Sequence, residues 1–250
     1  MSIPLFDVQC GFGGFQPGVR EVVSADETLA EMDRLGVERA LVRTTPCEMD
    51  KELVLSNAQL YDARRRHERL IPCPAVVPYC GDELPEEEAQ VADAIAHGAG
   101  AVVLRPEADC WTPEEWCCGR LLSVLEARRV PVLCLTKMLP LSAVGGLAGS
   151  HAALPIIVAQ TEYRTYRSLW TLLKAFDNVH LSIGSNLTIH GCIEELAAAF
   201  GPERLLFGTG WPDSEMMTAI TQLTYADIPE GHKRLIGSGN LTRLMEGIRR

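Results

Sequence analysis

The chain has 250 residues, of which 47% are hydrophobic, and this suits one large domain spanning residues 1–250. A formal net charge of −10, with acidic residues scattered rather than in blocks, argues against nucleic acid and anionic membranes as partners. No apolar run reaches the roughly 18 residues of a membrane span, and the N-terminus lacks the features of a signal peptide, so we expect a cytoplasmic protein. The nine cysteines include no CxxC pair, which predicts reduced thiols rather than a disulfide framework.

Short aliphatic and β-branched runs alternate with helix-like segments along the whole chain. Their starts lie roughly 25 to 35 residues apart, the repeat of strand–helix units with a parallel sheet. Eight such units predict an α/β fold, a single (β/α)8 TIM barrel. The predicted strands are residues 3–8, 40–43, 70–77, 100–104, 130–135, 154–159, 179–183 and 204–207.

Helix punctuation supports this division. Ser24 and Glu27 form a capping box, and Gly36 closes the helix that follows. Thr112 and Pro113 repeat the start signal before a leucine-rich stretch. Residues 229–245 predict a C-terminal helical segment, broken at its glycines, that we expect to pack on the outside of the barrel.

The second half of the chain resembles the amidohydrolase-related TIM-barrel hydrolases. The resemblance is carried in order by VPVLCLT (130–136), LPIIVAQTE (154–162), FGPERLLFGTGWP (200–212) and the Gly239-Asn240 pair. It covers nearly the whole chain and implies the barrel fold. It also implies hydrolysis of amide, lactone or related C–N and C–O bonds, or decarboxylation, of a small polar or anionic substrate.

Members of that family hold a metal through four histidines and an aspartate at the strand ends. Carried over by position, these ligands fall on Gln9, Gly11, Leu135, Gln160 and Gly210. Zinc and manganese prefer imidazole, thiolate or carboxylate, and an amide is a weak neutral donor. We therefore expect the family's metal site to be lost and any chemistry to need no cofactor.

An atypical metal site is the alternative. Cys10 and Cys134 lie at strand ends, and His190 is the one histidine that follows a strand on the expected active face. Alternation along the strands turns both thiols away from Gln9 and Leu135, toward the helices. Packing cysteines are therefore the favoured interpretation.

Two arginines end predicted strands on the expected active face. Arg43 follows the second strand and Arg105 the fourth. Their planar guanidinium groups bind carboxylates or phosphates, so we interpret both as substrate-binding candidates. The alternative is that each pairs with a local acid such as Glu48 or Glu107.

The loop after the sixth strand is unusually polar. We assign substrate binding to Gln160 and Arg164, and a catalytic role to Glu162. Thr161 or Thr165 as a simple N-cap is the alternative.

Asp7 lies one alternation step before Gln9, so both are expected on the same side of strand one, deep in the barrel. An arginine partner would keep Asp7 ionised, whereas isolation would raise its pKa toward the range of a general acid. We consider Asp7 a catalytic candidate and Gln9 a substrate-binding one. A structural residue that bridges neighbouring strands is the alternative for Asp7.

The last two loops supply further candidates. Asn186 and His190 suit hydroxyl recognition and proton transfer, and His190 could equally cap a helix. Trp211 suits a stacking platform for substrate, and Asp213 a late acid or an ordinary N-cap.

Two functions follow from these residues. One is a metal-independent enzyme that works through Asp7, Glu162 and His190; the other is a barrel that binds a metabolite or a protein partner without turnover. The sequence fixes neither the substrate nor the oligomeric state, and a homo-oligomer is compatible with it.

Overall fold

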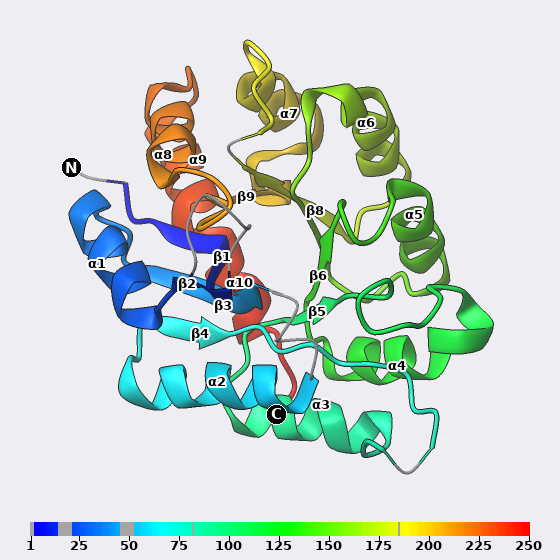
Figure 1. Ribbon diagram of the computed structural model, residues 1–250. Coiled ribbons are helices and arrows are strands. Elements are labelled where there is room, and N and C mark those ends of the chain that lie inside the picture. The colour runs from blue at the N-terminus through cyan, green and yellow to red at the C-terminus, as the bar shows by residue number, and fades with distance from the viewer. Residues whose placement is uncertain (1–2, 15–21, 46–52, 82, 185) are drawn as a thin grey trace.

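The computed structural model describes residues 3–14, 22–45, 53–81, 83–184 and 186–250. Within these residues, eight parallel strands form a barrel wall with helices around it (Figure 1), which confirms the predicted (β/α)8 fold. The parallel strands are β1 (Phe6–Gly14), β3 (Arg39–Thr45), β4 (Leu70–Pro72), β5 (Val102–Leu104), β6 (Val132–Leu135), β7 (Ile156–Ala159), β8 (Val179–Ile183) and β9 (Leu205–Phe207).

The strands form two sheets, in the orders β2-β1-β3-β4 and β5-β6-β7-β8-β9. The first sheet carries one short antiparallel strand, β2 (Val22–Val23), which pairs with the end of β1 and was not predicted. The two sheets are joined at both of their seams. A parallel bridge connects Ala75 to Val103, and the Gly210 amide donates to the Gln9 carbonyl at 2.8 Å.

The helices begin near the predicted signals. Ser24 and Glu27 form the expected capping box of the first helix, and Gly36 ends it in the left-handed region at φ 74°. The fourth helix begins at Glu115, and Glu114 rather than Thr112 is its N-cap. The helices that follow strands are α1 (Ala25–Leu35), α2 (Leu53–Arg66), α3 (Glu87–Ala96), α4 (Glu115–Arg128), α5 (Leu141–Ser150), α6 (Tyr166–Ala175), α7 (Cys192–Phe200) and α8 (Met216–Tyr225). None of the described helices is long and apolar enough to cross a bilayer.

Alternate residues of each strand divide the buried apolar side chains into two layers. Leu133, Ile157 and Leu206 belong to the layer inside the barrel. Cys10 and Cys134 belong to the layer between strands and helices, as alternation predicts. Burial raises the pKa of the Cys134 thiol to about 12, so this cysteine is a packing residue rather than a thiolate ligand.

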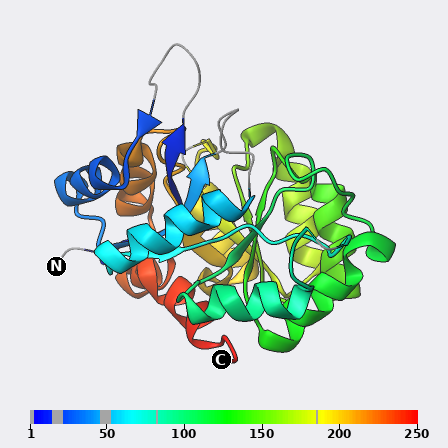
Figure 2. The same cartoon turned by 60° about the horizontal axis from the view of Figure 1, so that its bottom comes forward.

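The C-terminal segment closes one end of the barrel. It comprises α9 (Glu230–Arg234), a π-helix (Leu235–Gly239) and α10 (Asn240–Glu246), and Figure 2 shows it, in red, at the end opposite the arrowheads of β1. Leu241 joins the apolar layer inside the barrel. The prediction of a segment on the outside was therefore wrong, because the helical pattern does not reveal which surface its apolar face covers.

Asn240 and Gly237 hold this C-terminal segment against the barrel. The Asn240 side-chain amide donates to the carbonyls of Pro202 and Leu205, each at 2.8 Å. A Cβ at Gly237 would lie 2.6 Å from the Pro4 carbonyl oxygen, so only glycine allows this close approach. With this end closed, the opposite end, where the strands finish, is the one that remains for a site.

Candidate active site at the barrel mouth

Asp7 joins the strand that begins the barrel to the strand that ends it. It is fully buried, and its Oδ1 accepts from the amides of Gln9 at 2.8 Å and Thr209 at 3.0 Å, while its Oδ2 accepts from the Thr209 hydroxyl. The pairing of β1 with β3 shifts register between Asp7 and Cys10. Asp7 thus bridges two strands, which is the structural interpretation that the sequence left open.

The Asp7 carboxyl has a perturbed acidity. Desolvation by burial raises its pKa to about 6, although the hydrogen bonds from Thr209 and Gln9 and the charge of Arg43 act in the opposite direction. Asp7 therefore titrates near neutrality, but its oxygens are engaged by the protein itself.

The side chains at two of the family's ligand positions bond within the protein. Gln9 Oε1 accepts from the Gln160 amide at 3.2 Å and from the Ser182 hydroxyl at 3.4 Å. Gln160 has φ 58°, a left-handed conformation that a non-glycine residue adopts only when its surroundings hold it there. The network ties β1, β7 and β8 together at the mouth.

Arg43 and Gln160 meet at one carboxylate oxygen. The Arg43 Nη2 and the Gln160 Nε2 both lie 3.3 Å from Oδ2 of Asp213. The Arg43 side chain is 4% exposed and that of Asp213 is 22% exposed, so the pair lies at the boundary between core and solvent. Asp213 is neither the N-cap of α8, which is Glu215, nor a sequence neighbour of Arg43. The predicted partner Glu48 lies outside the described residues.

Three buried polar atoms at this mouth have no hydrogen-bond partner in the described part of the chain. They are Arg43 Nε, Gln160 Oε1 and Thr161 Oγ1. Arg43 is 3% exposed, Gln160 7% and Thr161 1%. Because buried polar groups are nearly always bonded, such atoms indicate a place for water or a ligand.

Arg105 pairs with a local acid, which is the alternative that the sequence left open. Its Nε and Nη2 donate to the two carboxylate oxygens of Asp109 at 3.1 and 2.8 Å, and both side chains are buried. The local acid is Asp109, one helical turn along the chain, and not Glu107. A guanidinium satisfied in this bidentate way has less capacity for a substrate anion than Arg43 has.

The remaining candidates lie outside the network around Arg43. Glu162, Arg164, Asn186 and His190 are exposed, and Arg164 donates to the Tyr163 hydroxyl at 3.0 Å. Trp211 is buried in the layer between strands and helices, and its indole nitrogen donates to the Thr28 hydroxyl at 3.2 Å. These placements separate the predicted catalytic residues Glu162 and His190 from the predicted binding residues Gln9, Arg43 and Gln160.

Sequence reasoning missed Ser182 and the pairing of Asp213. Ser182 was detectable, because it is a hydroxyl residue inside the buried strand β8. Its neighbours Leu181 and Ile183 belong to the outer layer, so alternation turns Ser182 toward the barrel axis. The ion pair of Asp213 with Arg43 joins residues 170 positions apart, which no local pattern reveals.

The side chains at the mouth do not fit the metal that the family resemblance implies. Among the described residues, no group of three histidine, cysteine, aspartate or glutamate side chains has the arrangement to hold an ion. Gln9 Oε1 already accepts two hydrogen bonds, and Leu135 is part of the apolar layer. The Arg43 guanidinium beside Asp213 would repel a further cation.

Comparison with known proteins gives a family match over most of the chain. The model of a family described as amidohydrolase matches residues 16–245. No curated protein is similar enough to count as a match.

Solved structures resemble this barrel at low sequence identity. The 5-carboxyvanillate decarboxylase of Sphingomonas paucimobilis is 12% identical, with a TM-score of 0.71 over 98% of this chain and 99% of that one. The dihydroxybenzoic acid decarboxylase of Polaromonas, solved with manganese and the inhibitor 2-nitroresorcinol, is 15% identical, with a TM-score of 0.73 over 98% and 97%. A probable 2-pyrone-4,6-dicarboxylic acid hydrolase of Acinetobacter baumannii, with citric acid bound, is 12% identical, with a TM-score of 0.69 over 97% and 99%. These likenesses show the fold.

Proposed function

The chain belongs to the amidohydrolase family, and from that membership and the geometry of the mouth we propose that it binds a small carboxylated substrate through Arg43. The proposed reaction is cleavage of a C–N or C–O bond, or loss of the carboxyl group, without a resident metal and within one domain. The observation that carries the proposal is the buried Arg43 guanidinium, one nitrogen of which has no partner among the described residues.

Arg43 suits this role because only part of its guanidinium is engaged. Asp213 accepts from Nη2 at 3.3 Å, a long contact for a charge-assisted hydrogen bond, and Nε remains unpartnered. A substrate carboxylate that accepts from Nε would remove this deficit. Gln160 Oε1 and Thr161 Oγ1, also unpartnered, would bind a donor such as a hydroxyl on the same substrate. The structural relatives named above include enzymes of carboxylated aromatic compounds, which is consistent with this substrate class.

Asp213 is the acid–base group that we propose for the reaction. It is the carboxylate of the network with access to solvent, whereas the Asp7 carboxylate is fully buried. Asp213 would accept a proton from an attacking water, or donate one to a leaving group or carbanion. Arg43 would stabilise the negative charge that develops on the substrate.

Binding without turnover is the second candidate. The observation that favours it is that neutral glutamines, Gln9 and Gln160, occupy two of the family's ligand positions, where the Gln9 side chain accepts from the Gln160 main-chain amide. Arg43 would bind the same carboxylated ligands in this case, and turnover alone separates the two functions.

A ligand screen of the purified protein tests the proposal. We expect hydroxybenzoates, citrate or related carboxylates to raise the thermal midpoint, because a ligand at 100 times its Kd adds about 2.7 kcal/mol to the unfolding free energy. The matched neutral amides, such as salicylamide for salicylate, are the control and should give no shift. Product analysis of each carboxylate that binds then separates enzyme from binder. Equal shifts with the amides, or binding that requires stoichiometric manganese or zinc by elemental analysis, would contradict the proposal.

A further inference from the structure

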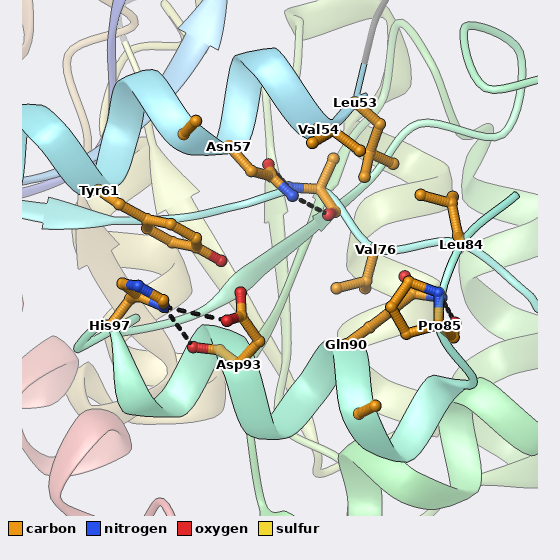
Figure 3. A pocket seen from close by; sticks show the side chains of 13 residues that line it. Leu53, Val54, Asn57, Tyr61, Val76, Leu84, Pro85, Gln90, Asp93 and His97 are labelled. Carbon is orange, nitrogen blue, oxygen red and sulfur yellow. Dashed lines mark hydrogen bonds and ion pairs between the residues drawn. The ribbon is translucent and has the colours of Figure 1, made fainter.

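A cavity of about 520 Å³ lies between α2 and α3, and none of its lining residues belongs to the network around Arg43 (Figure 3). This volume falls in the range of sites for small organic ligands. Its walls are largely apolar. Val54, which lines the cavity from α2, is 56% exposed to solvent although its side chain is hydrophobic. The apolar lining comprises Leu53, Val54, Ala58, Val76, Leu84 and Pro85.

The two amide side chains of the cavity are used by the main chain. Asn57 donates to the Ala75 carbonyl at 2.8 Å and accepts from the Ala75 amide at 2.9 Å. Gln90 bonds in the same reciprocal way with Val77, at 3.1 and 3.2 Å. These pairs fix both helices to the segment that follows β4, and they offer little hydrogen-bonding capacity to a ligand.

One end of the cavity is acidic. Tyr61 and His97 stack there with ring centroids 4.1 Å apart, and Asp93 lies beside them, with its Oδ1 3.3 Å from His97 Nδ1 (Figure 3). Burial, with a contribution from the Asp93 charge, raises the pKa of the Tyr61 phenol, so it stays protonated. Among the described residues no lysine or arginine forms an ion pair with Asp93; its ion-pair partner is His97.

We propose that this cavity binds a small amphiphilic amine, with its apolar body between α2 and α3 and its ammonium group on Asp93. The apolar walls favour an apolar ligand body. Burying exposed apolar surface such as that of Val54 favours transfer of that body from water into the cavity. The Asp93 carboxylate, whose ion-pair partner among the described residues is His97, selects a cation over a neutral or anionic head group. The net charge of −10 favours cations further. The inference does not depend on the function proposed for the barrel mouth.

Three probes that share one apolar body test the charge preference. They are 4-phenylbutylamine, 4-phenylbutanol and 4-phenylbutyrate, with binding followed by calorimetry and by ligand-observed NMR. Because the Asp93 side chain is partly in solvent, we expect the amine to bind about 3- to 5-fold more tightly than the alcohol, and the butyrate most weakly. Equal affinities, or binding by none of the three, would overturn the inference.

Three variants locate the site, all at exposed positions where the fold should tolerate the change. Asp93→Asn should weaken binding of the amine about 3- to 5-fold and leave binding of the alcohol unchanged. Ala58→Trp fills the cavity from α2 and should abolish binding of both probes. The matched control, Gln59→Trp, adds the same side chain on the same helix at an exposed residue that does not line the cavity, and should bind as the parent does. Amine binding that survives Ala58→Trp would show that the ligand binds elsewhere.

Discussion

Replacing Asp7 with alanine is expected to lower the free energy of unfolding by about 4 kcal/mol. The change removes the acceptor of two main-chain amides, of Gln9 and Thr209, and of the Thr209 hydroxyl, all of them buried. A buried donor without a partner costs roughly 1 to 3 kcal/mol, so the amides alone account for most of the loss. Urea denaturation at neutral pH, followed by circular dichroism, measures it.

Asp7→Asn is the matched control. Both main-chain amides donate to the same oxygen, Oδ1, so an asparagine oxygen can accept both while its NH2 donates to the Thr209 hydroxyl. We expect this variant to lose about 1 kcal/mol or less. If asparagine cost as much as alanine, the charge of Asp7 rather than its acceptor geometry would hold the two strands together.

The pH dependence of stability gives a second readout of the same residue. The folded pKa of Asp7, about 6, lies above its ordinary value of 3.8, so the folded state binds the proton more tightly than the unfolded state does. The stability that this contributes is fully present below pH 3.8 and is lost as the pH rises through 6. The difference corresponds to about 3 kcal/mol. Asp7→Asn should lack this component, and an unchanged pH profile would contradict the assignment.

The fold was readable from sequence because its strands are buried on both faces. Such strands appear as short continuous apolar runs, and each of the eight predicted runs overlaps a parallel strand among the described residues. β2 was not predicted, because it is two residues long and is defined by its pairing with β1. The position of α10 was predicted wrongly, because amphipathic periodicity shows that one helix face is buried but not which part of the protein it packs against.

The candidate site was readable only in part. Gln9, Arg43 and Gln160 were predicted from their places at strand ends, and the structure brings them into one network. Glu162 follows the same strand as Gln160, yet its side chain is exposed. Gln160 has φ 58°, in the left-handed region. Glycine is the usual sign of a left-handed backbone conformation, so a glutamine at position 160 does not predict one.

Arg43→Met is expected to weaken carboxylate binding about 10- to 160-fold if Arg43 is the anchor of the substrate. A charge-assisted hydrogen bond contributes roughly 1.5 to 3 kcal/mol, and the fold-change follows from that range. Methionine keeps much of the side-chain volume in this buried position, which limits packing loss. Calorimetry with the carboxylate that gives the largest thermal shift, beside its neutral amide, measures the effect.

The same substitution leaves Asp213 without its cation, so a folding defect must be distinguished from lost recognition. Arg43→Met combined with Asp213→Asn removes both charges and should restore stability without restoring affinity. Arg43→Lys keeps the charge but not the planar guanidinium, and its affinity for the carboxylate should lie between those of the parent and Arg43→Met.

Asp213→Asn alone separates binding from chemistry: with Arg43 intact the carboxylate should still bind, whereas any turnover should fall at least 100-fold. Because the negative charge of Asp213 beside the guanidinium repels a second carboxylate, this variant should bind carboxylates as tightly as the parent or more tightly. Parent-like affinity in Arg43→Met would place the anion elsewhere at the mouth and remove the basis of the proposed function.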